Sequence, residues 1–327
     1  MKAIQIQTDH KDRPLVWQTT HDPVLGPGEV LIEAHATSVN RADLAQRAGH
    51  YPPPPGASHI LGLDTAGRIL EMGQGVSGWQ VGDRVCALLA GGGYAELVAV
   101  PYQMLMPIPD DWSYQQAAAM PEVFLTAFAN IFMEAAFQEG ETVLVHGGAS
   151  GVGTAAIQLV REAGGRMIVT AGVEEKVARC MSLGADLAIN YKEEDFVQRV
   201  QDYTGGQGVD VILDMVGAGY LSQNLSLLKP RGRLVVIALL RGSRAEVDLA
   251  LMMRRRLRLI GSVLRSRTLE EKEQIKGQFM GRFWSLVERG TIGPVIDSVY
   301  SIQQANEAHQ HIAEYQNIGK IILKIRD

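Results

Sequence analysis

The stretch of sequence that decides the fold is Thr142-Val143-Leu144-Val145-His146-Gly147-Gly148-Ala149-Ser150-Gly151-Val152-Gly153. It has the pattern of a buried strand, a glycine-rich turn and the start of a helix in unbroken succession. Small residues in such a turn let the backbone approach phosphate groups, and the N–H groups and dipole at the helix N-terminus attract negative charge. The stretch therefore predicts a site for the pyrophosphate of a dinucleotide, built mainly from backbone.

The match to the dinucleotide motif G-x-G-x-x-G is incomplete. The turn supplies Gly148 and Gly153 but has Ser150 at the middle position, with Gly151 beside it. A glycine-rich match alone is weak, because such turns also occur wherever a strand simply meets a helix. Here the following segment, Val152 to Ala163, is small and apolar on most faces, as expected of a helix packed on a parallel sheet. This context favours the dinucleotide interpretation.

The end of the second expected strand, Met167 to Thr170, indicates which dinucleotide is bound. NAD-binding proteins carry an acidic residue about 20 residues past the glycines, which accepts hydrogen bonds from the ribose. Gly172 stands there instead, so no carboxylate would repel a 2′-phosphate, and Lys176 can supply a positive charge. Alternatively, Gly172 only ends the strand and Lys176 is an ordinary solvated residue. We predict NADP(H) rather than NAD.

Length and composition limit the classes of function. With 327 residues the chain exceeds the size at which one core usually keeps growing, so two domains are expected. A net charge of -5 gives no reason to expect nucleic acid or an anionic membrane as the main partner. The one basic cluster, Arg254-Arg255-Arg256 with Arg258, is interpreted as a solvated helix end rather than a binding patch. No apolar stretch is long enough to span a bilayer and Met1 leads into a strand pattern, so we expect a soluble, cytoplasmic protein.

The two cysteines, Cys86 and Cys180, are far apart in the sequence. This suits a reducing compartment and argues against a disulfide framework or a paired-thiolate metal site. Cys86 lies in an apolar run and is expected to be a small core residue.

The pattern of elements changes once along the chain. Residues 1 to 122 alternate short strands with turn signals and predict a β-rich, barrel-like domain. Residues 123 to 267 alternate strands with helices and predict a doubly wound α/β sheet of six parallel strands. Residues 268 to 327 predict a long helix, a second helix near Ala305 to Tyr315 and a terminal strand Ile321 to Ile325, which we expect to return to the first domain. The first of the six strands is expected at the start of the stretch Thr142–Gly153, and the others at Met167–Thr170, Leu187–Asn190, Val209–Asp214, Arg233–Leu239 and Leu257–Val263.

Taken together, these segments resemble the zinc-free quinone oxidoreductases of the medium-chain dehydrogenase/reductase superfamily, and the resemblance covers essentially the whole chain. Within that superfamily the chain looks most similar to the zeta-crystallin-like, stress-inducible NADPH:quinone reductase branch. The resemblance implies a GroES-like domain, residues 1–122 and 268–327, and a Rossmann domain, residues 123–267. The segments that carry it are Val39–Asp43, Gly49–Gly56, Leu125–Ala127, Gly148–Gly153, Asn190–Tyr191, Val263–Arg267 and Asn317–Lys320.

The resemblance also implies roles for individual residues. The positions that match the 2′-phosphate and adenosine ribose site are Gly172, Lys176 and Tyr191; those at the pyrophosphate are Ser150, Gly151 and Val152. Other positions that match the cofactor lining are Asn40, Thr126, Leu240, Val263, Arg265 and Asn317. Tyr51 and Asn40 match the quinone pocket and are the candidate catalytic residues. Alternatively, Asn40 forms a turn, Tyr51 is a packed aromatic and Thr126 caps a helix.

The zinc sites of related alcohol dehydrogenases cannot be built from this sequence. A catalytic zinc needs thiolate and imidazole ligands, and a structural zinc needs four thiolates. The corresponding regions here read Asn40-Arg41-Ala42-Asp43 and Gly62-Leu63-Asp64, and the chain has only two cysteines. We therefore expect no metal and a reaction that needs none.

The implied reaction is reduction of a quinone by NADPH, through hydride transfer or through one-electron transfer. Orientation of the acceptor would then matter more than acid–base catalysis. Two alternatives stay open: a zinc-free enoyl or enone reductase, and a non-catalytic, crystallin-like NADPH-binding protein. The expected strand Leu257 to Val263 would lie at the edge of the sheet, where pairing with a second copy gives a homodimer.

Overall fold

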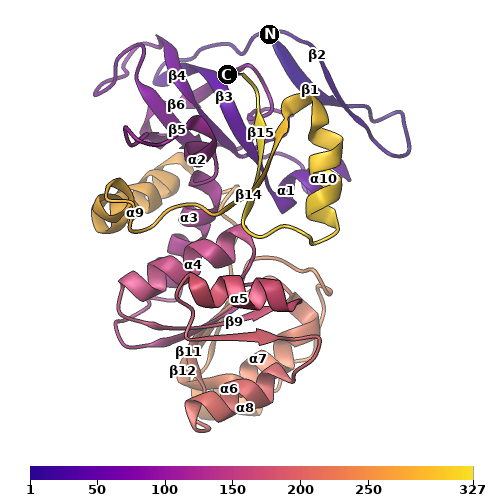
Figure 1. Ribbon diagram of the computed structural model, residues 1–327, viewed down its shortest axis with the longest axis vertical. Helices are drawn as coiled ribbons and strands as arrows, with labels where there is room; N and C mark the ends of the chain where they lie inside the picture. The colour runs from indigo at the N-terminus through magenta and orange to yellow at the C-terminus, as the bar shows by residue number, and fades with distance from the viewer. Residues whose placement is uncertain (327) are drawn as a thin grey trace. The chain divides into compact units, whose positions relative to one another are not determined.

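The fold was obtained as a computed structural model, and the structure describes residues 1–326. The chain divides into two compact units (Figure 1). Unit 1 comprises Met1–Val123 and Arg265–Asp327, and unit 2 comprises Phe124–Leu264. The last segment of the chain therefore belongs to the same unit as the first.

Unit 2 is built on a six-stranded, wholly parallel sheet. The strands, in spatial order, are β10 (Leu187–Asn190), β9 (Arg166–Ala171), β8 (Thr142–His146), β11 (Val209–Asp214), β12 (Leu228–Val236) and β13 (Arg258–Gly261). The strand order reverses between β8 and β11, so the sheet is doubly wound as expected. In such sheets ligands bind beyond the carboxyl ends of the strands, beside this reversal.

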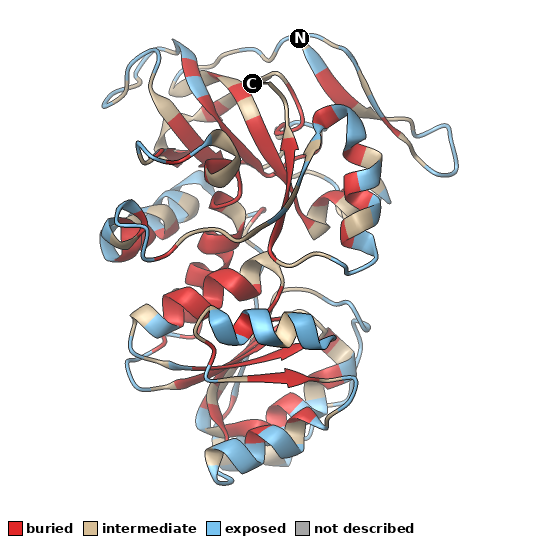
Figure 2. Ribbon diagram, in the orientation of Figure 1, coloured by how far each residue is buried: buried red, intermediate tan, exposed pale blue. Residues whose placement is uncertain are grey.

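Helices cover both faces of the sheet in unit 2. Figure 1 shows α4 and α5 on one face and α6, α7 and α8 on the other. These helices are α4 (Gly151–Glu162), α5 (Glu174–Ser182), α6 (Phe196–Thr204), α7 (Leu221–Leu227) and α8 (Leu249–Arg255). The inner strands are mostly apolar, as expected where both faces are covered, and Figure 2 shows them largely buried while the outer helix faces are exposed. The central strands contribute several fully buried residues each to the core, among them Leu144, Ile168, Ile212 and Leu234.

One strand of unit 2 is displaced from its expected position. The expected strand Arg233–Leu239 is observed as Leu228–Val236. It begins earlier because Leu228 pairs with Val209 of β11, and it ends earlier because the chain turns away after Val236. Leu239 and Leu240 are consequently exposed rather than in the strand.

Unit 1 is built on an antiparallel sheet with one parallel pair at its edge. The strands of this seven-stranded sheet are β14 (Ile296–Ser301), β15 (Lys320–Lys324), β3 (Glu29–Val39), β4 (Asp64–Met72), β5 (Arg84–Leu88), β7 (Leu105–Pro107) and β6 (Leu97–Pro101), which also pairs with β3. A separate hairpin consists of β1 (Lys2–Ile6) and β2 (Leu15–Thr19). The terminal strand β15 pairs with β3 and so returns the C-terminal segment to the first domain.

The helices of unit 1 are short, apart from one. They are α1 (Arg41–Arg47), α2 (Tyr114–Ala118), α9 (Leu269–Glu288) and α10 (Ala305–Ala313), and the chain passes from unit 1 to unit 2 within α3 (Pro121–Phe128). Short α1 and α2 lack the repeated apolar spacing that identifies a helix in a sequence. Over residues 1–326, no helix combines the length and the apolar character needed to cross a bilayer.

A buried histidine links the strand before the glycine turn to its neighbours. The His146 ring, at the end of β8, contacts the Thr170 hydroxyl through Nδ1 at 3.1 Å and Asn224 Oδ1 of α7 through Nε2 at 2.8 Å. Burial lowers the pKa of His146 to about 4, so the ring is neutral at neutral pH. A neutral ring donates from Nε2 to Asn224 and accepts at Nδ1 from Thr170.

We predict that His146 makes unit 2 less stable in acid. Unfolded, this histidine takes up a proton below its ordinary value of 6.5, whereas the folded protein does not do so until about 4. The free energy of unfolding should therefore fall between these values, with a contribution of up to about 1.4 kcal/mol per pH unit from this residue. Urea unfolding of the protein and of H146Q at several pH values in this range measures the free energy of unfolding. This free energy should change less steeply with pH in the variant. The exposed His10, changed to Gln, is the control, and an unchanged slope in H146Q would contradict the assignment.

Candidate functional site

The glycine turn of unit 2 is fixed by close packing between β8, α4 and β9. A Cβ on Gly148 would lie 2.5 Å from Val169 Cβ, and a Cβ on Gly153 would lie 2.4 Å from the Gly147 carbonyl oxygen. Gly147 has a φ of 70°, in the left-handed region that glycine adopts most readily. The backbone can therefore follow this path only with glycine at these positions.

The first turn of α4 presents free backbone donors. Ser150, which precedes the helix, accepts a hydrogen bond from Gly153 N at 3.0 Å through its hydroxyl oxygen. The N–H groups of Gly151 and Val152 make no hydrogen bond within residues 1–326. They carry the positive end of the helix dipole and can bind an anion. Ser150 thus orients the helix start, and Gly151 and Val152 supply the donors.

Parallel pairing of β9 and β10 brings together two residues that the sequence analysis singled out. Asn190 pairs with Ala171, so Gly172 and Tyr191 follow adjacent strand ends. A Cβ on Gly172 would lie 3.0 Å from the Tyr191 hydroxyl oxygen. The Tyr191 hydroxyl therefore lies over a residue that has no side chain, and no carboxylate occupies this place.

Two further cations lie beside Tyr191, and the sequence analysis did not identify either. Lys192 Cε would lie 3.4 Å from a Cβ on Gly172. The Arg241 guanidinium lies 6.0 Å from the centroid of the Tyr191 ring. Lys176 is half-buried in the first turn of α5, directly after the same strand end. The signal for Lys192 was present in the sequence, as a basic residue directly after a strand end, whereas Arg241 lies in an irregular segment.

The other predicted cofactor residues of unit 2 differ in exposure. Leu240 and Val263 are 44% and 48% exposed and follow the carboxyl ends of β12 and β13. Thr126 is buried in the middle of α3, so the alternative that it caps a helix is wrong.

In unit 1 the Asn40 side chain lies in a buried polar network. Its Nδ2 donates to Asp64 Oδ2 at 2.8 Å, and its Oδ1 accepts from Lys320 Nζ at 2.5 Å. Asp64 is fully buried and also accepts from the Ser38 hydroxyl at 2.5 Å and from Glu122 N at 2.7 Å. The contacts fix the amide of Asn40 and leave one of its N–H bonds available.

The comparisons with known proteins agree with this arrangement. Residues 26–110 match the family described as "Alcohol dehydrogenase GroES-like domain", and residues 151–278 match "Zinc-binding dehydrogenase". The chain is 36% identical to a quinone oxidoreductase of Rattus norvegicus over 297 residues, 90% of this chain and 88% of that protein. The chain belongs to the quinone oxidoreductase family of the medium-chain dehydrogenase/reductase superfamily.

Solved structures of related proteins have the same fold as this chain. The Escherichia coli quinone oxidoreductase complexed with NADPH superposes with a TM-score of 0.89 at 26% identity, covering 99% of this chain and 100% of that one. A structure described as an NAD-dependent alcohol dehydrogenase reaches 0.87 at 30% identity, with 99% and 100% covered. The expected combination of a GroES-like domain and a Rossmann domain is confirmed. One of these two structures is named for NAD and the other contains NADPH, so the fold alone does not identify the coenzyme.

The zinc named in one of the matched families does not fit the residues of this quinone oxidoreductase homologue. Cys86 and Cys180 lie in different units, and burial raises the pKa of both thiols, that of Cys180 to about 12. Where Asn40 and Asp64 converge, the cation is the ammonium group of Lys320. Among residues 1–326, no three His, Cys, Asp or Glu side chains are grouped so that they could hold a metal ion.

Around Tyr51, this family member has a buried arginine with several partners. Arg265 Nε donates to the Ala90 carbonyl at 2.7 Å, Nη1 to the Tyr51 carbonyl at 3.3 Å and Nη2 to Gln46 Oε1 at 2.7 Å. Its guanidinium also lies 5.2 Å from the centroid of the Tyr51 ring. Burial raises the pKa of the half-buried Tyr51 phenol, which is therefore a neutral donor at neutral pH. Arg265 thus positions the Tyr51 loop.

Asn317, the last of the predicted site residues, stabilises its own loop. Its Nδ2 donates to the Gly319 carbonyl at 2.7 Å. The next residue after Gly319 is Lys320, the ammonium partner of Asn40. Asn317 therefore shapes the segment that leads Lys320 into the polar network.

We predict that the Lys320 ammonium stabilises the fold mainly by compensating Asp64. K320M leaves the buried Asp64 carboxylate without its cation and should lower the free energy of unfolding by about 3–5 kcal/mol. Adding D64N removes the uncompensated charge, so D64N/K320M should be more stable than K320M. Chemical denaturation measures all three proteins, with K11M as the exposed-lysine control. A double variant no more stable than K320M would show that charge compensation is not the reason.

Proposed function

We propose that this protein catalyses the reduction of quinones with NADPH as the electron donor, without a metal ion. When bound, NADPH supplies a hydride to an acceptor. The observation that carries the proposal is the polar network of unit 1, which holds the Asn40 amide and the Lys320 ammonium group where related enzymes need metal ligands. The ammonium group already donates to Val39 O, Asn40 Oδ1 and Asp64 Oδ2, so the amide is the group that can orient a carbonyl oxygen. Neither group can replace a Lewis acid that stabilises an alkoxide.

The preference for NADPH is supported by the charges around Gly172. A 2′-phosphate there would meet the Tyr191 hydroxyl and the cations of Lys192, Arg241 and Lys176, with no carboxylate at position 172. The pyrophosphate would be held by the N–H groups of Gly151 and Val152. The Escherichia coli relative that superposes on this chain was solved with NADPH.

The quinone is supported by the relatives and by the residues of unit 1. The Rattus norvegicus relative is named a quinone oxidoreductase. A quinone is reduced readily because its product anion is stabilised by resonance, so the protein needs to orient it more than to activate it. Tyr51 donates from a neutral phenol, and Asn40 keeps one N–H available beside the network. We propose that these two donors bind the acceptor's oxygens.

A homodimer is also proposed. Strand β13 is the last strand of the six-stranded sheet, and one of its edges pairs with no other strand among residues 1–326. Leu259 on this strand is 42% exposed. Pairing of this strand with a second copy would satisfy the edge and cover the leucine.

The coenzyme preference can be reversed by one charge. G172D places a carboxylate beside the Tyr191 hydroxyl, where it repels a 2′-phosphate and can accept hydrogen bonds from the ribose of NADH. We expect kcat/KM for NADPH to fall by about tenfold or more, while that for NADH is kept or raised. G172A is the matched control, because it adds the Cβ without the charge. Equal losses with both coenzymes in G172D would contradict the proposed phosphate site.

Tyr51 is tested by removal of its hydroxyl. Y51F should lower quinone turnover by about tenfold while the Kd for NADPH stays unchanged, because the lost donor acts on the acceptor. N40A should have the same effect, but it also removes partners of Asp64 and Lys320, so its stability is measured in parallel. The exposed Tyr203, changed to Phe, is the control.

A panel of acceptors separates the quinone proposal from its rivals. Purified protein is assayed for NADPH oxidation with a quinone, an enone and an enoyl thioester. Turnover of the enone or thioester alone would favour an enone reductase. Tight NADPH binding without turnover of any acceptor would favour a binding protein. Quinone turnover that is undiminished in both Y51F and N40A would remove these residues from the mechanism.

A further inference from the structure

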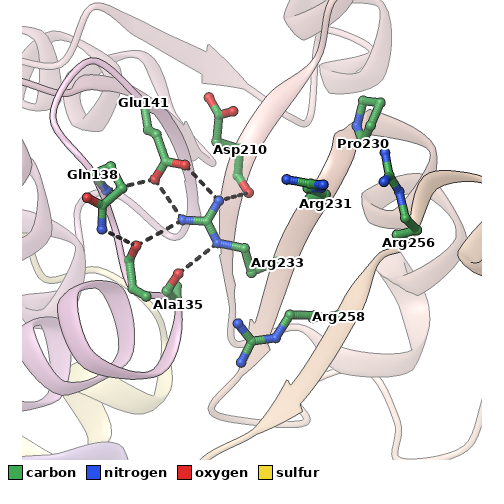
Figure 3. A pocket seen from close by; sticks show the side chains of 10 residues that line it. Ala135, Gln138, Glu141, Asp210, Pro230, Arg231, Arg233, Arg256 and Arg258 are labelled. Atoms are coloured by element: carbon green, nitrogen blue, oxygen red, sulfur yellow. Dashed lines mark hydrogen bonds and ion pairs between the residues drawn. The ribbon is translucent and has the colours of Figure 1, made fainter.

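A second polar pocket lies on unit 2, at the opposite end of the parallel sheet from the glycine turn. It has a volume of about 520 Å³, and Figure 3 shows four arginines among the residues that line it: Arg231, Arg233, Arg256 and Arg258. Arg233 of β12 is paired in register with Arg258, the first residue of β13. Glu141 directly precedes β8, whereas the glycine turn follows its other end. The pocket is therefore at the amino ends of the strands and distinct from the dinucleotide site.

The carboxylates of this pocket are already paired. Glu141 accepts from Arg233 Nη1 at 2.8 Å and from Nη2 at 2.7 Å, and the Ala135 carbonyl accepts from Arg233 Nε at 2.7 Å. Asp210 accepts from Lys229 Nζ at 2.7 Å and from Thr142 N at 2.8 Å. Arg233 is thus a fixed, neutralised part of the pocket wall.

The other three arginines carry uncompensated charge. The guanidinium groups of Arg231, Arg256 and Arg258 make no hydrogen bond or ion pair with any residue from 1 to 326, and Figure 3 shows them separate from the Glu141–Arg233 pair. All three residues are exposed. The pocket therefore has three free cations and no free carboxylate.

The backbone at two of these arginines is unusual. Arg231 has a φ of 68° and Arg256 a φ of 53°, both in the left-handed region that favours glycine. Arg231 lies within β12 and Arg256 directly follows α8. Glycine would adopt both conformations more readily, yet the chain carries a cation at each position. At Arg256 this conformation is a common way to end a helix, whereas the end of a helix does not explain it at Arg231, inside β12.

We propose that this pocket binds a small phosphate-bearing molecule with at least two negative charges. Guanidinium groups present parallel N–H donors that match phosphate oxygens, and three of them together favour a multiply charged anion. The lining contains no aromatic side chain on which a base could stack, and the net charge of -5 disfavours a long polyanion. The proposal is independent of the reaction proposed above.

The test uses the full chain and inorganic pyrophosphate as the probe, with calorimetric titration at low ionic strength. Glycine accepts the left-handed backbone, so R231G and R256G remove the cations without adding strain. Each variant should bind pyrophosphate about tenfold more weakly than the unchanged protein, and R231G/R256G more weakly still. The matched control is R254Q, which removes the same charge from α8 at an exposed position outside the pocket.

The design separates the two phosphate-binding ends of the sheet. Pyrophosphate that binds at the glycine turn would keep its affinity in R231G/R256G, and this result would overturn the proposal. An equal loss in R254Q would also overturn it, because the effect would then reflect net charge rather than the pocket. Parallel titrations with ATP and with inorganic phosphate distinguish a nucleotide from a simple phosphate as the source of the anion. R231G/R256G should have a lower affinity for whichever of the two binds the unchanged protein.

Discussion

The parallel pairing of β9 with its two neighbours is the constraint on which the nucleotide site depends. His146 pairs with Thr170 across β8 and β9, and Asn190 pairs with Ala171 across β10 and β9. Because all three strands run in one direction, the segments that follow them emerge at the same edge of the sheet. A slip of one residue would turn every side chain to the other face and separate Gly172 from Tyr191. The apolar strands, buried on both faces, hold this register.

Unit 1 depends on the compensation of buried charge instead. Asp64 is fully buried, and a carboxylate in such a place is tolerated only when several donors surround it. Its partners come from the end of β3, the start of β15 and the start of α3, so the same contacts that satisfy the charge also join three elements. The Asn40 amide is consequently held in one orientation before any acceptor is present. This preorganisation is what a reaction governed by orientation requires.

The sequence predicted the doubly wound sheet well because its signals are local and strong. Buried strands such as Val209–Asp214 have an apolar centre, Val211 to Leu213, and Leu187–Asn190 was predicted with the bounds that the structure has. Elements whose stability comes from distant contacts were missed: the hairpin strand Leu15–Thr19, the half-exposed strand Ile296–Ser301 and the short helix Arg41–Arg47 have no regular apolar pattern. These elements form because other parts of unit 1 pack on them or pair with them.

In the candidate site, too, residues with a local sequence signal were predicted, and residues brought together by distant contacts were not. Gly172 was singled out from the sequence because it stands about 20 residues after the glycines, where NAD-binding proteins carry an acidic residue. Lys176 was singled out because it lies close to Gly172 in the sequence. Lys320 and Asp64 could not be linked to Asn40, because the three are brought together only by the pairing of β3 with β4 and β15. Of the basic cluster, Arg254 to Arg256 form the helix end that was predicted, since α8 ends at Arg255, whereas Arg258 begins strand β13. The prediction did not include Arg231, which is far from that cluster in the sequence.

The two ends of the parallel sheet offer an anion different physical means of binding. At the carboxyl ends the helix N-termini point toward the ligand, so backbone N–H groups and glycine suffice. At the amino ends the helix C-termini present carbonyl groups with partial negative charge, so an anion can be held there only by full positive charges. Arg255, at the end of α8 and outside the pocket, compensates two of these carbonyl groups. It donates hydrogen bonds to the carbonyl oxygens of Ser226 and Leu228, both at 2.8 Å. Arg231 and Arg258 make no such contact, and their charges are in excess of what the helix end requires.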